Sequence, residues 1–280
     1  MKRLSKFALQ AISLTSFLVL WQLVIVAGII PNYLVPTPIQ VIFALGKDFQ
    51  LLMTHTGITL LESLVGLAIG VFIGFVLAIL MDFFKTLDKL LSPLITISQT
   101  IPIVTIAPLL VLWLGYGLLP KIVLVAISTF FPITVALNSA FKAIDPDMVD
   151  LMTTMGATRM QIFWHVKLAA AAPQFFSGLK MSVTYAVIGA VIAEWLGGDA
   201  GLGVYMTRVR KAFAYDRMFA AIVVVSALSL VLMKLVELVQ KRALPWDTSQ
   251  DAKESASVGY LSGCQRVRTV TLMESKERSD

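Results

Sequence analysis

Long apolar stretches recur along this 280-residue chain, and they limit its fold more strictly than any other feature. A stretch of about eighteen apolar residues can cross a hydrocarbon core of roughly 30 Å as a helix. Hydrophobic residues make up 58% of the chain and charged residues only 14%, so a soluble domain could not bury this much apolar surface. The short alternating strands of a membrane barrel are not found. The sequence therefore predicts an all-α, polytopic membrane protein.

About six membrane spans are predicted within a transmembrane domain of residues 11–246. The spans cover residues 11–31, 57–81, 91–113, 121–140, 175–197 and 217–240. Residues 1–10 should form a cytoplasmic N-terminal segment. Residues 247–280 are polar and without helical periodicity, which predicts a disordered tail. Three prolines followed by a short amphipathic stretch, between the first two spans, predict a surface loop and an interfacial helix.

Basic residues flank the predicted spans unevenly, and this bias predicts the orientation of the chain. An even number of spans places both termini on one side, and more of the basic residues fall on that side: Lys2, Arg3, Lys6, Lys85, Lys89, Lys142, Arg159, Lys167, Lys241 and Arg242. Basic segments are retained in the cytoplasm, so we expect both termini to be cytoplasmic in an inner membrane. The net charge of +6 is thus assigned to membrane orientation, with no nucleic-acid partner.

Small residues and prolines mark the helices that should contact one another. Gly66, Gly70, Gly74 and Ala78 form a row at a spacing of four, which would let another backbone come close. Prolines in the third and fourth spans free backbone carbonyls that neighbours or water must satisfy, so these helices should be kinked and face a cavity. The residues predicted to line a translocation path in this way are Pro102, Pro108, Pro132 and Asn138.

Two carboxylates fall at membrane depth, where an ionised side chain is expensive and often functional. Glu194 precedes the glycine-rich sequence WLGGDAGLG. We add this carboxylate to the residues predicted to line the translocation path. Glu62 lies near the outer end of its span, where a water-facing position is as reasonable as a functional one. We expect both carboxylates to lie near a membrane surface.

The chain shows no enzyme motif. His55 and His165 are too few and too separate for a histidine-based metal centre, and the single Cys264 has no metal-site spacing. There is no G-x-x-x-x-G-K-[ST] phosphate loop, so the chain cannot bind ATP through such a loop of its own. We expect no catalytic residues, metal or cofactor in this chain, and any ATP to be bound by partner subunits.

A polar, glycine-interrupted segment at about residues 141–174 separates the fourth and fifth spans. Asp145 to Asp150 supply acidic residues and a proline suited to the start of a short helix, and Gly156 permits a sharp turn. Phe163 and Trp164 then lie on an apolar side of a second helix. Two short helices joined by a tight turn would form a rigid projection suited to a groove on a partner protein. A passive interfacial loop is the alternative interpretation.

The spacing of this segment resembles the EAA loop of ABC importer permeases. Its pattern is E-A-A, three residues, G, nine residues, and I-x-L-P. Asp150, Leu151 and Met152 occupy the E-A-A positions, Gly156 is the glycine, and Val166, Leu168 and Ala169 stand at the I-x-L-P positions. The acid is shortened, both alanines are enlarged and the last proline is replaced. The resemblance implies that these residues, with Phe163 and Trp164, receive an ATPase subunit.

The resemblance extends over residues 11–246 to the permease branch for nitrate, sulfonate, taurine and thiamine precursors. It is carried by PTPIQVIFAL, QTIPIVTIAPLLVLWLGYG and AEWLGGDAGLGVYMTRVRKAFAYDRMFAAI. EWLGG, GLGVYMTRV and LPW are most similar to permeases assigned to pyrimidine precursors of thiamine. The resemblance implies a type I ABC importer permease fold, a second permease copy as a homodimer, two cytoplasmic ATPases and an extracytoplasmic solute-binding protein.

Other interpretations remain open from the residues alone. An ion-coupled secondary transporter would need inverted repeats and charged residues near the middle of the membrane, and a membrane scaffold would leave its prolines without a path to line. The cluster Arg208, Arg210 and Lys211 is either a solvated charge run or a surface that docks an acidic face of the binding protein.

Overall fold

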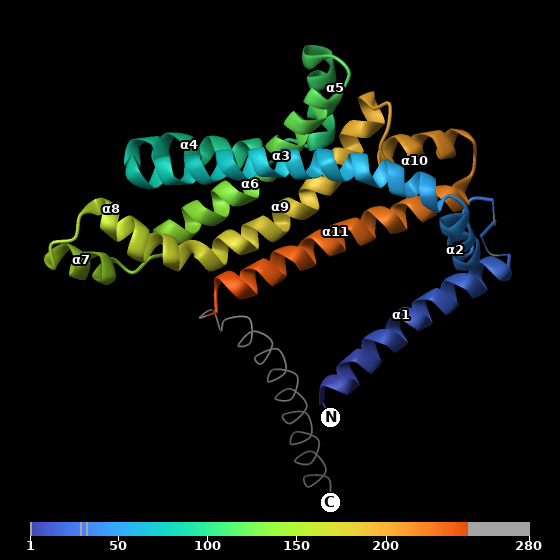
Figure 1. Ribbon diagram of the computed structural model, residues 1–280, viewed down its shortest axis with the longest axis horizontal. Coiled ribbons are helices and arrows are strands. Elements are labelled where there is room, and N and C mark those ends of the chain that lie inside the picture. The colour runs from blue at the N-terminus through green and yellow to red at the C-terminus, as the bar shows by residue number, and fades with distance from the viewer. Residues whose placement is uncertain (1, 29, 32, 246–280) are drawn as a thin grey trace, which may run out of the picture. The chain divides into compact units, whose positions relative to one another are not determined.

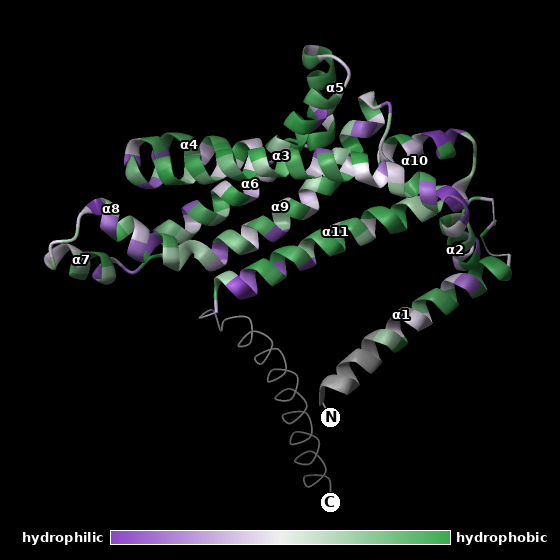
Figure 2. Cartoon of the chain, viewed as in Figure 1, coloured by the Kyte–Doolittle hydropathy of each residue, from purple (hydrophilic) through white to green (hydrophobic). Residues whose placement is uncertain are grey.

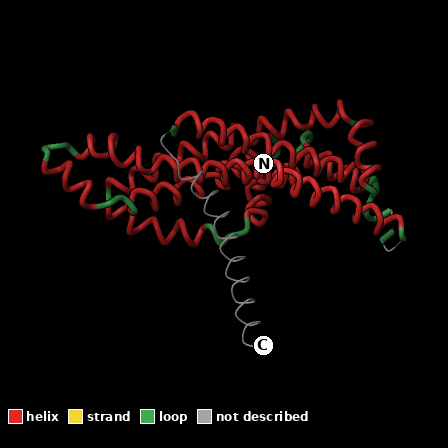
Figure 3. The backbone as a smooth tube through the Cα atoms, turned by 90° about the horizontal axis from the view of Figure 1, so that it is seen from below, coloured by secondary structure: helices red, strands yellow, loops and turns green. Residues whose placement is uncertain are grey.

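A computed structural model describes residues 2–28, 30–31 and 33–245 of the chain. Within these residues every regular element is a helix (Figure 3), which confirms the all-α prediction. Of the described residues, those up to Glu237 belong to one compact unit, and 238–245 fall in a second. Cys264 and the predicted tail at 247–280 lie outside the described residues.

The helices follow one another along the chain without long connections (Figure 1). They are α1 (Lys2–Val26), α2 (Pro38–Lys47), α3 (Phe49–Phe83), α4 (Lys85–Ser98), α5 (Ile103–Leu114), α6 (Leu118–Lys142), α7 (Pro146–Thr154), α8 (Arg159–Ile162), the π-helix η1 (Phe163–Lys167), α9 (Leu168–Gly197), α10 (Leu202–Lys211) and α11 (Tyr215–Ala243).

Four helical segments of the described chain are long and apolar enough to cross a membrane: Phe49–Phe83, Leu118–Lys142, Arg159–Gly197 and Tyr215–Ala243. Helices α4 and α5 would together form a fifth span, and α1 contributes a shorter apolar stretch, Ala11–Val26. Figure 2 shows α3 and α11 coloured mainly as hydrophobic, whereas hydrophilic residues gather around α8 and α10. Four or five spans thus stand against the six predicted, because the first, at 11–31, is matched only by the shorter stretch Ala11–Val26. Two of the others differ in form.

The third predicted span, residues 91–113, is broken into α4 and α5, which are bent by 99°. Pro102 is the N-cap residue of α5 with an extended backbone, and a proline disfavours helical geometry in the residue before it. Pro93 and Pro108 instead lie inside α4 and α5. Of the three prolines expected to distort this span, Pro102 lies at the break.

The fifth predicted span, residues 175–197, begins much earlier in the structure. Helix α8, η1 and α9 form one continuous helical segment of 39 residues, Arg159–Gly197. The interpretation of the 141–174 segment as two short helices is therefore wrong for its second half. The residues from Arg159 onward form the start of a long membrane helix, because Leu168 and the four alanines after it favour helix and Pro173 is accommodated inside α9.

The row of small residues on α3 contacts α6, as its spacing predicted. A Cβ atom at Gly66 would lie 2.5 Å from the Cβ of Val125, and one at Gly70 would lie 2.6 Å from the carbonyl oxygen of Ala126. Farther along, the Thr134 hydroxyl donates to the Gly74 carbonyl at 3.4 Å. Only glycine allows the two backbones to approach this closely.

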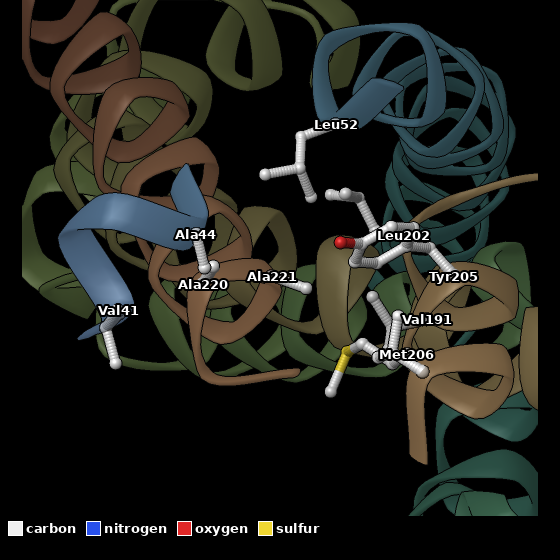
Figure 4. Close-up of a cluster of buried hydrophobic side chains, with 10 residues drawn as sticks. Val41, Ala44, Leu52, Val191, Leu202, Tyr205, Met206, Ala220 and Ala221 are labelled. Carbon is white, nitrogen blue, oxygen red and sulfur yellow. The ribbon is translucent and has the colours of Figure 1, made fainter. Parts of the chain in front are cut away.

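Helices α3, α6 and α9 together form the central layer of the compact unit. Gly178 of α9 faces α6, where an added Cβ would lie 2.9 Å from the Pro132 carbonyl oxygen and the Ala136 side chain. At one end of this layer, buried side chains of α2, α3, α9, α10 and α11 form a cluster. Figure 4 shows Leu52 of α3 next to Leu202 and Tyr205 of α10. This cluster fixes α10 against the end of α3.

The contact between α3 and α6 predicts that replacing two glycines of α3 by alanine will affect stability differently. Replacing Gly70 by Ala forces α3 away from the α6 backbone, and overpacking of this kind costs on the order of 1–3 kcal/mol. Gly57 has no atom within 4 Å of an added Cβ, so Gly57→Ala should be neutral or stabilising. Melting temperatures of the purified chains in detergent measure the difference; equal melting temperatures would contradict it.

Candidate functional site

A groove of about 1010 Å³ opens between the helices of the described chain. The junction of α4 and α5, one face of α6 and one face of α9 line it, and Asp145 and Met148 lie at its α7 end. Pro102 and Pro132 belong to its lining. Two of the residues predicted to line a translocation path therefore face the same cavity.

The other three predicted path residues lie elsewhere. Pro108 lines a separate, smaller cavity with Tyr116 and Leu196. The Asn138 amide donates to Asp88 at 3.1 Å and to Ser92 at 3.3 Å, and so ties α6 to α4. Glu194 is 1% exposed and does not contact the groove. Pro108, Asn138 and Glu194 therefore do not line the groove with Pro102 and Pro132, which corrects the prediction of one shared path. Asn138 and Glu194 instead form hydrogen bonds within the chain.

Glu194 instead organises the start of α10. Its carboxylate accepts a hydrogen bond from the Thr59 hydroxyl at 2.7 Å and another from the Gly203 backbone N–H at 2.5 Å. The neighbouring N–H groups of Gly201 and Leu202 donate to His55 and to the Thr59 hydroxyl. Side chains of α3 and α9 thus satisfy the first N–H groups of α10, which have no partner within that helix.

Glycines are required around this carboxylate. Gly201 has a φ of +125°, and a Cβ added there would collide with the Glu194 carboxyl group. A Cβ at Gly203 would lie 2.5 Å from the Val191 carbonyl oxygen. The glycine-rich sequence after Glu194 is therefore a turn folded closely over a buried acid at the end of α9.

Glu62 is also buried, and its partner is Lys121 of α6 at 2.7 Å, with side-chain exposures of 1% and 7%. Lys121 also approaches the Ala200 carbonyl oxygen at 3.5 Å. This ion pair joins α3, α6 and the turn before α10. No local pattern in the sequence links Glu62 and Lys121, because they are 59 positions apart.

The segment between α6 and α9 begins with a well-capped turn. Asp145 caps α7 by accepting from the Asp147 N–H at 3.0 Å. At the other end, Gly156 has a φ of +84°, and the Ala157 N–H donates to the Met152 carbonyl at 3.0 Å. This is a Schellman motif, whose αL position favours glycine. Thr158 and Gln161 then form a capping box at the start of α8. The predicted sharp turn at Gly156 is confirmed.

The same segment is anchored to two membrane helices. Phe163 is 3% exposed and packs against Phe83 of α3 and Phe141 of α6, with ring centroids 5.2 and 5.8 Å away. The Lys167 ammonium donates to both carboxylate oxygens of Asp82 at 2.6 and 2.9 Å. Phe163 therefore cannot supply contact surface to a partner, which corrects that prediction. No local pattern indicates the Lys167–Asp82 pair, since its members are 85 residues apart.

The remaining predicted contact residues differ in exposure. Asp150, Leu151, Trp164 and Ala169 are exposed, whereas Met152, Val166 and Leu168 are partly buried. Met148, Met155 and Met160 add exposed apolar side chains that the motif did not include, and Met155 is 75% exposed. Met148, Leu151 and Met155 are spaced along one face of α7 and its cap. We call Met148, Leu151, Met155, Met160 and Trp164 the α7–α8 apolar surface.

The predicted basic cluster lies at the end of α10. Arg208 donates to the Asp199 carbonyl at 2.7 Å and so holds the turn before α10, whereas Arg210 and Lys211 are exposed. Burial, with a hydrogen bond to Asp48, raises the pKa of the Tyr205 hydroxyl on the same helix. Helix α9 has 30 residues and is about 45 Å long, so this cluster and the α7–α8 apolar surface are at opposite ends of a membrane helix.

The fold and these sites define a multi-pass helical permease. Residues 66–244 match the protein family described as "Binding-protein-dependent transport system inner membrane component", and the chain belongs to this family. It is therefore a multi-pass inner-membrane protein and a permease subunit of the ABC importer type. This membership favours binding-protein-dependent transport over the ion-coupled alternative.

Relatives from several organisms agree with this assignment. A "Probable ABC transporter permease protein" of Haemophilus influenzae is 39% identical over 77% of this chain and 88% of its own length. The formylaminopyrimidine transport permease protein ThiX of Halalkalibacterium halodurans is 35% identical over 78% of this chain and 88% of its own. A chain of the inward-facing MetNI methionine ABC transporter matches with a TM-score of 0.60 at 20% identity, covering 71% of this chain and 97% of its own; that similarity shows the fold.

The buried Glu62–Lys121 pair predicts a strong dependence of each residue on the other. Lys121→Met should destabilise the chain by about 3–5 kcal/mol, because the Glu62 carboxylate would remain buried without a counter-ion. The double substitution Glu62→Leu with Lys121→Met should recover most of this loss. Melting temperatures of the two variants and the parent chain measure the coupling. Additive effects of the two substitutions would show that the pair does not interact.

Proposed function

We propose that this chain is the membrane permease of an ATP-driven importer, and that the α7–α8 apolar surface docks a cytoplasmic ATP-binding cassette subunit. The observation that carries the proposal is the exposure of this surface on a rigid, well-capped turn. Its apolar side chains alternate with Asp147, Asp150 and Thr154, so the segment lies in water. Apolar patches exposed to water are typical of protein interaction sites.

The anchoring of the segment supports a mechanical role. Movement of α7–α8 acts on α3 through Phe83 and Asp82, on α6 through Phe141, and on α9 through the uninterrupted backbone. The π-helix η1 lies at this joint, and π-helical turns are frequent at functional sites. Closure of two ATPases on bound ATP would shift these helices together and change access to the groove from one side of the membrane to the other.

The complex we propose contains two permease copies as a homodimer, two ATPase subunits and a solute-binding protein. ATP is bound by the ATPases and not by this chain. Both termini and the α7–α8 segment face the cytoplasm, and the α10 end faces the opposite side, where the binding protein docks. The family description, which names binding-protein-dependent transport, supports the last partner.

The transported solute we propose is a pyrimidine precursor of thiamine. Support comes from the 35% identity to a permease named for formylaminopyrimidine transport. Permeases named for aliphatic sulfonates and taurine are more distant, at 26% identity each. Uptake of formylaminopyrimidine, taurine and an alkyl sulfonate by the reconstituted complex distinguishes these substrates.

Replacing Gly156 by Val should separate assembly of the permease from its coupling to the ATPase. A β-branched residue is strained at a φ of +84°, so the turn between α7 and α8 would change while the membrane helices remain intact. We expect ATPase co-purification to fall by at least about tenfold, since the α7–α8 apolar surface would lose its shape. Solute uptake should fall in parallel.

Gly57→Val is the matched control, because Gly57 has free space around it and an ordinary helical backbone. This variant should co-purify with the ATPase as the parent chain does. Membrane insertion of both variants is followed by their yield in detergent extracts. Normal ATPase association and uptake by the Gly156 variant would rule out the proposed docking site.

Charge reversal at the end of α10 tests whether the solute-binding protein docks there. Arg210→Glu with Lys211→Glu should slow solute delivery several-fold, because the exposed cations would no longer attract an acidic partner surface. Basal ATPase activity should not change, since the α7–α8 segment is at the other end of α9. Arg208 is left intact because it holds the turn at Asp199. An unchanged delivery rate would assign the cluster to a solvated helix end.

A further inference from the structure

Several polar side chains that line the groove have no hydrogen-bond partner among the described residues. On α6 and α9, the hydroxyls away from the groove all donate to backbone carbonyls: Thr129, Thr134, Ser182 and Thr184. Ser139 and Ser177, which line the groove, make no such bond, and neither do the side chains of Gln99, Gln174 and Tyr185. Unpaired polar groups in a membrane helix must be satisfied by water or by a ligand.

Three of these side chains lie in one part of the groove. Helices α6 and α9 are antiparallel, and the contact of Gly178 with Ala136 sets their register. This register brings Ser139, near the end of α6, close to Gln174 and Ser177, near the start of α9. One amide and two hydroxyls therefore border one region, which offers both donors and acceptors to a solute. Gln99 lines the groove about 10 Å farther along, because it follows Ser92, a partner of Asn138, by seven residues of α4 and its cap.

The charge of the groove limits the kind of solute. None of the described lining residues is Lys, Arg or His, and the one charged residue is Asp145 at the α7 end. A bound anion would therefore have no counter-ion, and Asp145 would repel it. The start of α5 at Ile103 also lies on the groove, and its partial positive charge suits any hydrogen-bond acceptor, so the discrimination rests on the charged side chains of the lining.

Aromatic residues complete the lining. Phe131 of α6 and Tyr185 of α9 both line the groove. Tyr185 lies about 16 Å beyond Gln174 along α9, so these rings border another part of the same cavity. The cavity of about 1010 Å³ has room for a small heterocycle with water around it.

From these observations we infer that this permease has a solute subsite of its own, in which Gln174, with Ser139 and Ser177, selects an uncharged polar solute by hydrogen bonds and excludes inorganic and sulfonate anions. The inference rests on the proposed function, since it assumes that the groove lies on the transport path. It adds that the permease, and not the binding protein alone, discriminates between solutes. It also separates the pyrimidine class from the nitrate and sulfonate classes.

Equilibrium binding to the purified full chain in lipid nanodiscs tests this subsite directly. Formylaminopyrimidine, ethanesulfonate and nitrate are the probes. We expect the parent chain to bind formylaminopyrimidine more tightly than either anion. Gln174→Leu should weaken this binding roughly tenfold, because an amide that bonds the ligand is lost. Gln50→Leu, an exposed glutamine of α3 outside the groove, is the matched control and should bind as the parent does.

A third variant tests the role of charge. Gln174→Lys places a cation in the groove and should raise ethanesulfonate binding at least about tenfold, while formylaminopyrimidine binding falls. Anions that bind the parent chain as well as the pyrimidine does would overturn the inference. So would equal pyrimidine binding by the parent and the Gln174→Leu variant, or the absence of binding by all three probes. ATPase co-purification with these variants is measured separately, so loss of the subsite and failure of the proposed ATPase docking are distinguished.

Discussion

The close contact between α3 and α6 supports the other features of this subunit. A membrane offers apolar helices little solvent advantage for associating, so contact area at short backbone distance has to hold them together. Gly66, Gly70 and Gly74 provide that distance, and α9 adds Gly178 on the other side of α6. The groove, the α7–α8 segment and the start of α10 are all built on this layer, so their geometry depends on the same glycines.

Polar side chains in this layer have two distinct uses. Where they are paired, they join elements: Glu62 with Lys121, Glu194 with Thr59 and Gly203, and Lys167 with Asp82. Gln174 and Ser177 have no such partner among the described residues, and both face the groove. Because unsatisfied polar groups are costly in lipid, these two side chains are available to water or to a solute.

The α7–α8 segment connects a surface available to a partner protein with helices inside the membrane. Its second half continues without interruption into α9, and Phe163 is buried between α3 and α6. A partner that moves the exposed Met155 or Trp164 would thus move three membrane helices and the walls of the groove. The Arg210 and Lys211 cations at the other end of α9 are placed to contact a partner on the opposite side.

The sequence alone determined the all-α class, the positions of the apolar spans, the glycine row and the turn at Gly156, because each depends on local periodicity or on the backbone freedom of one residue type. Only the tertiary structure decided that Phe163 is buried, that Glu194 caps α10 rather than lining the groove, and that Glu62 pairs with Lys121. These contacts join residues far apart in the chain, and no local pattern encodes which distant side chain will neutralise a buried charge or satisfy a helix end.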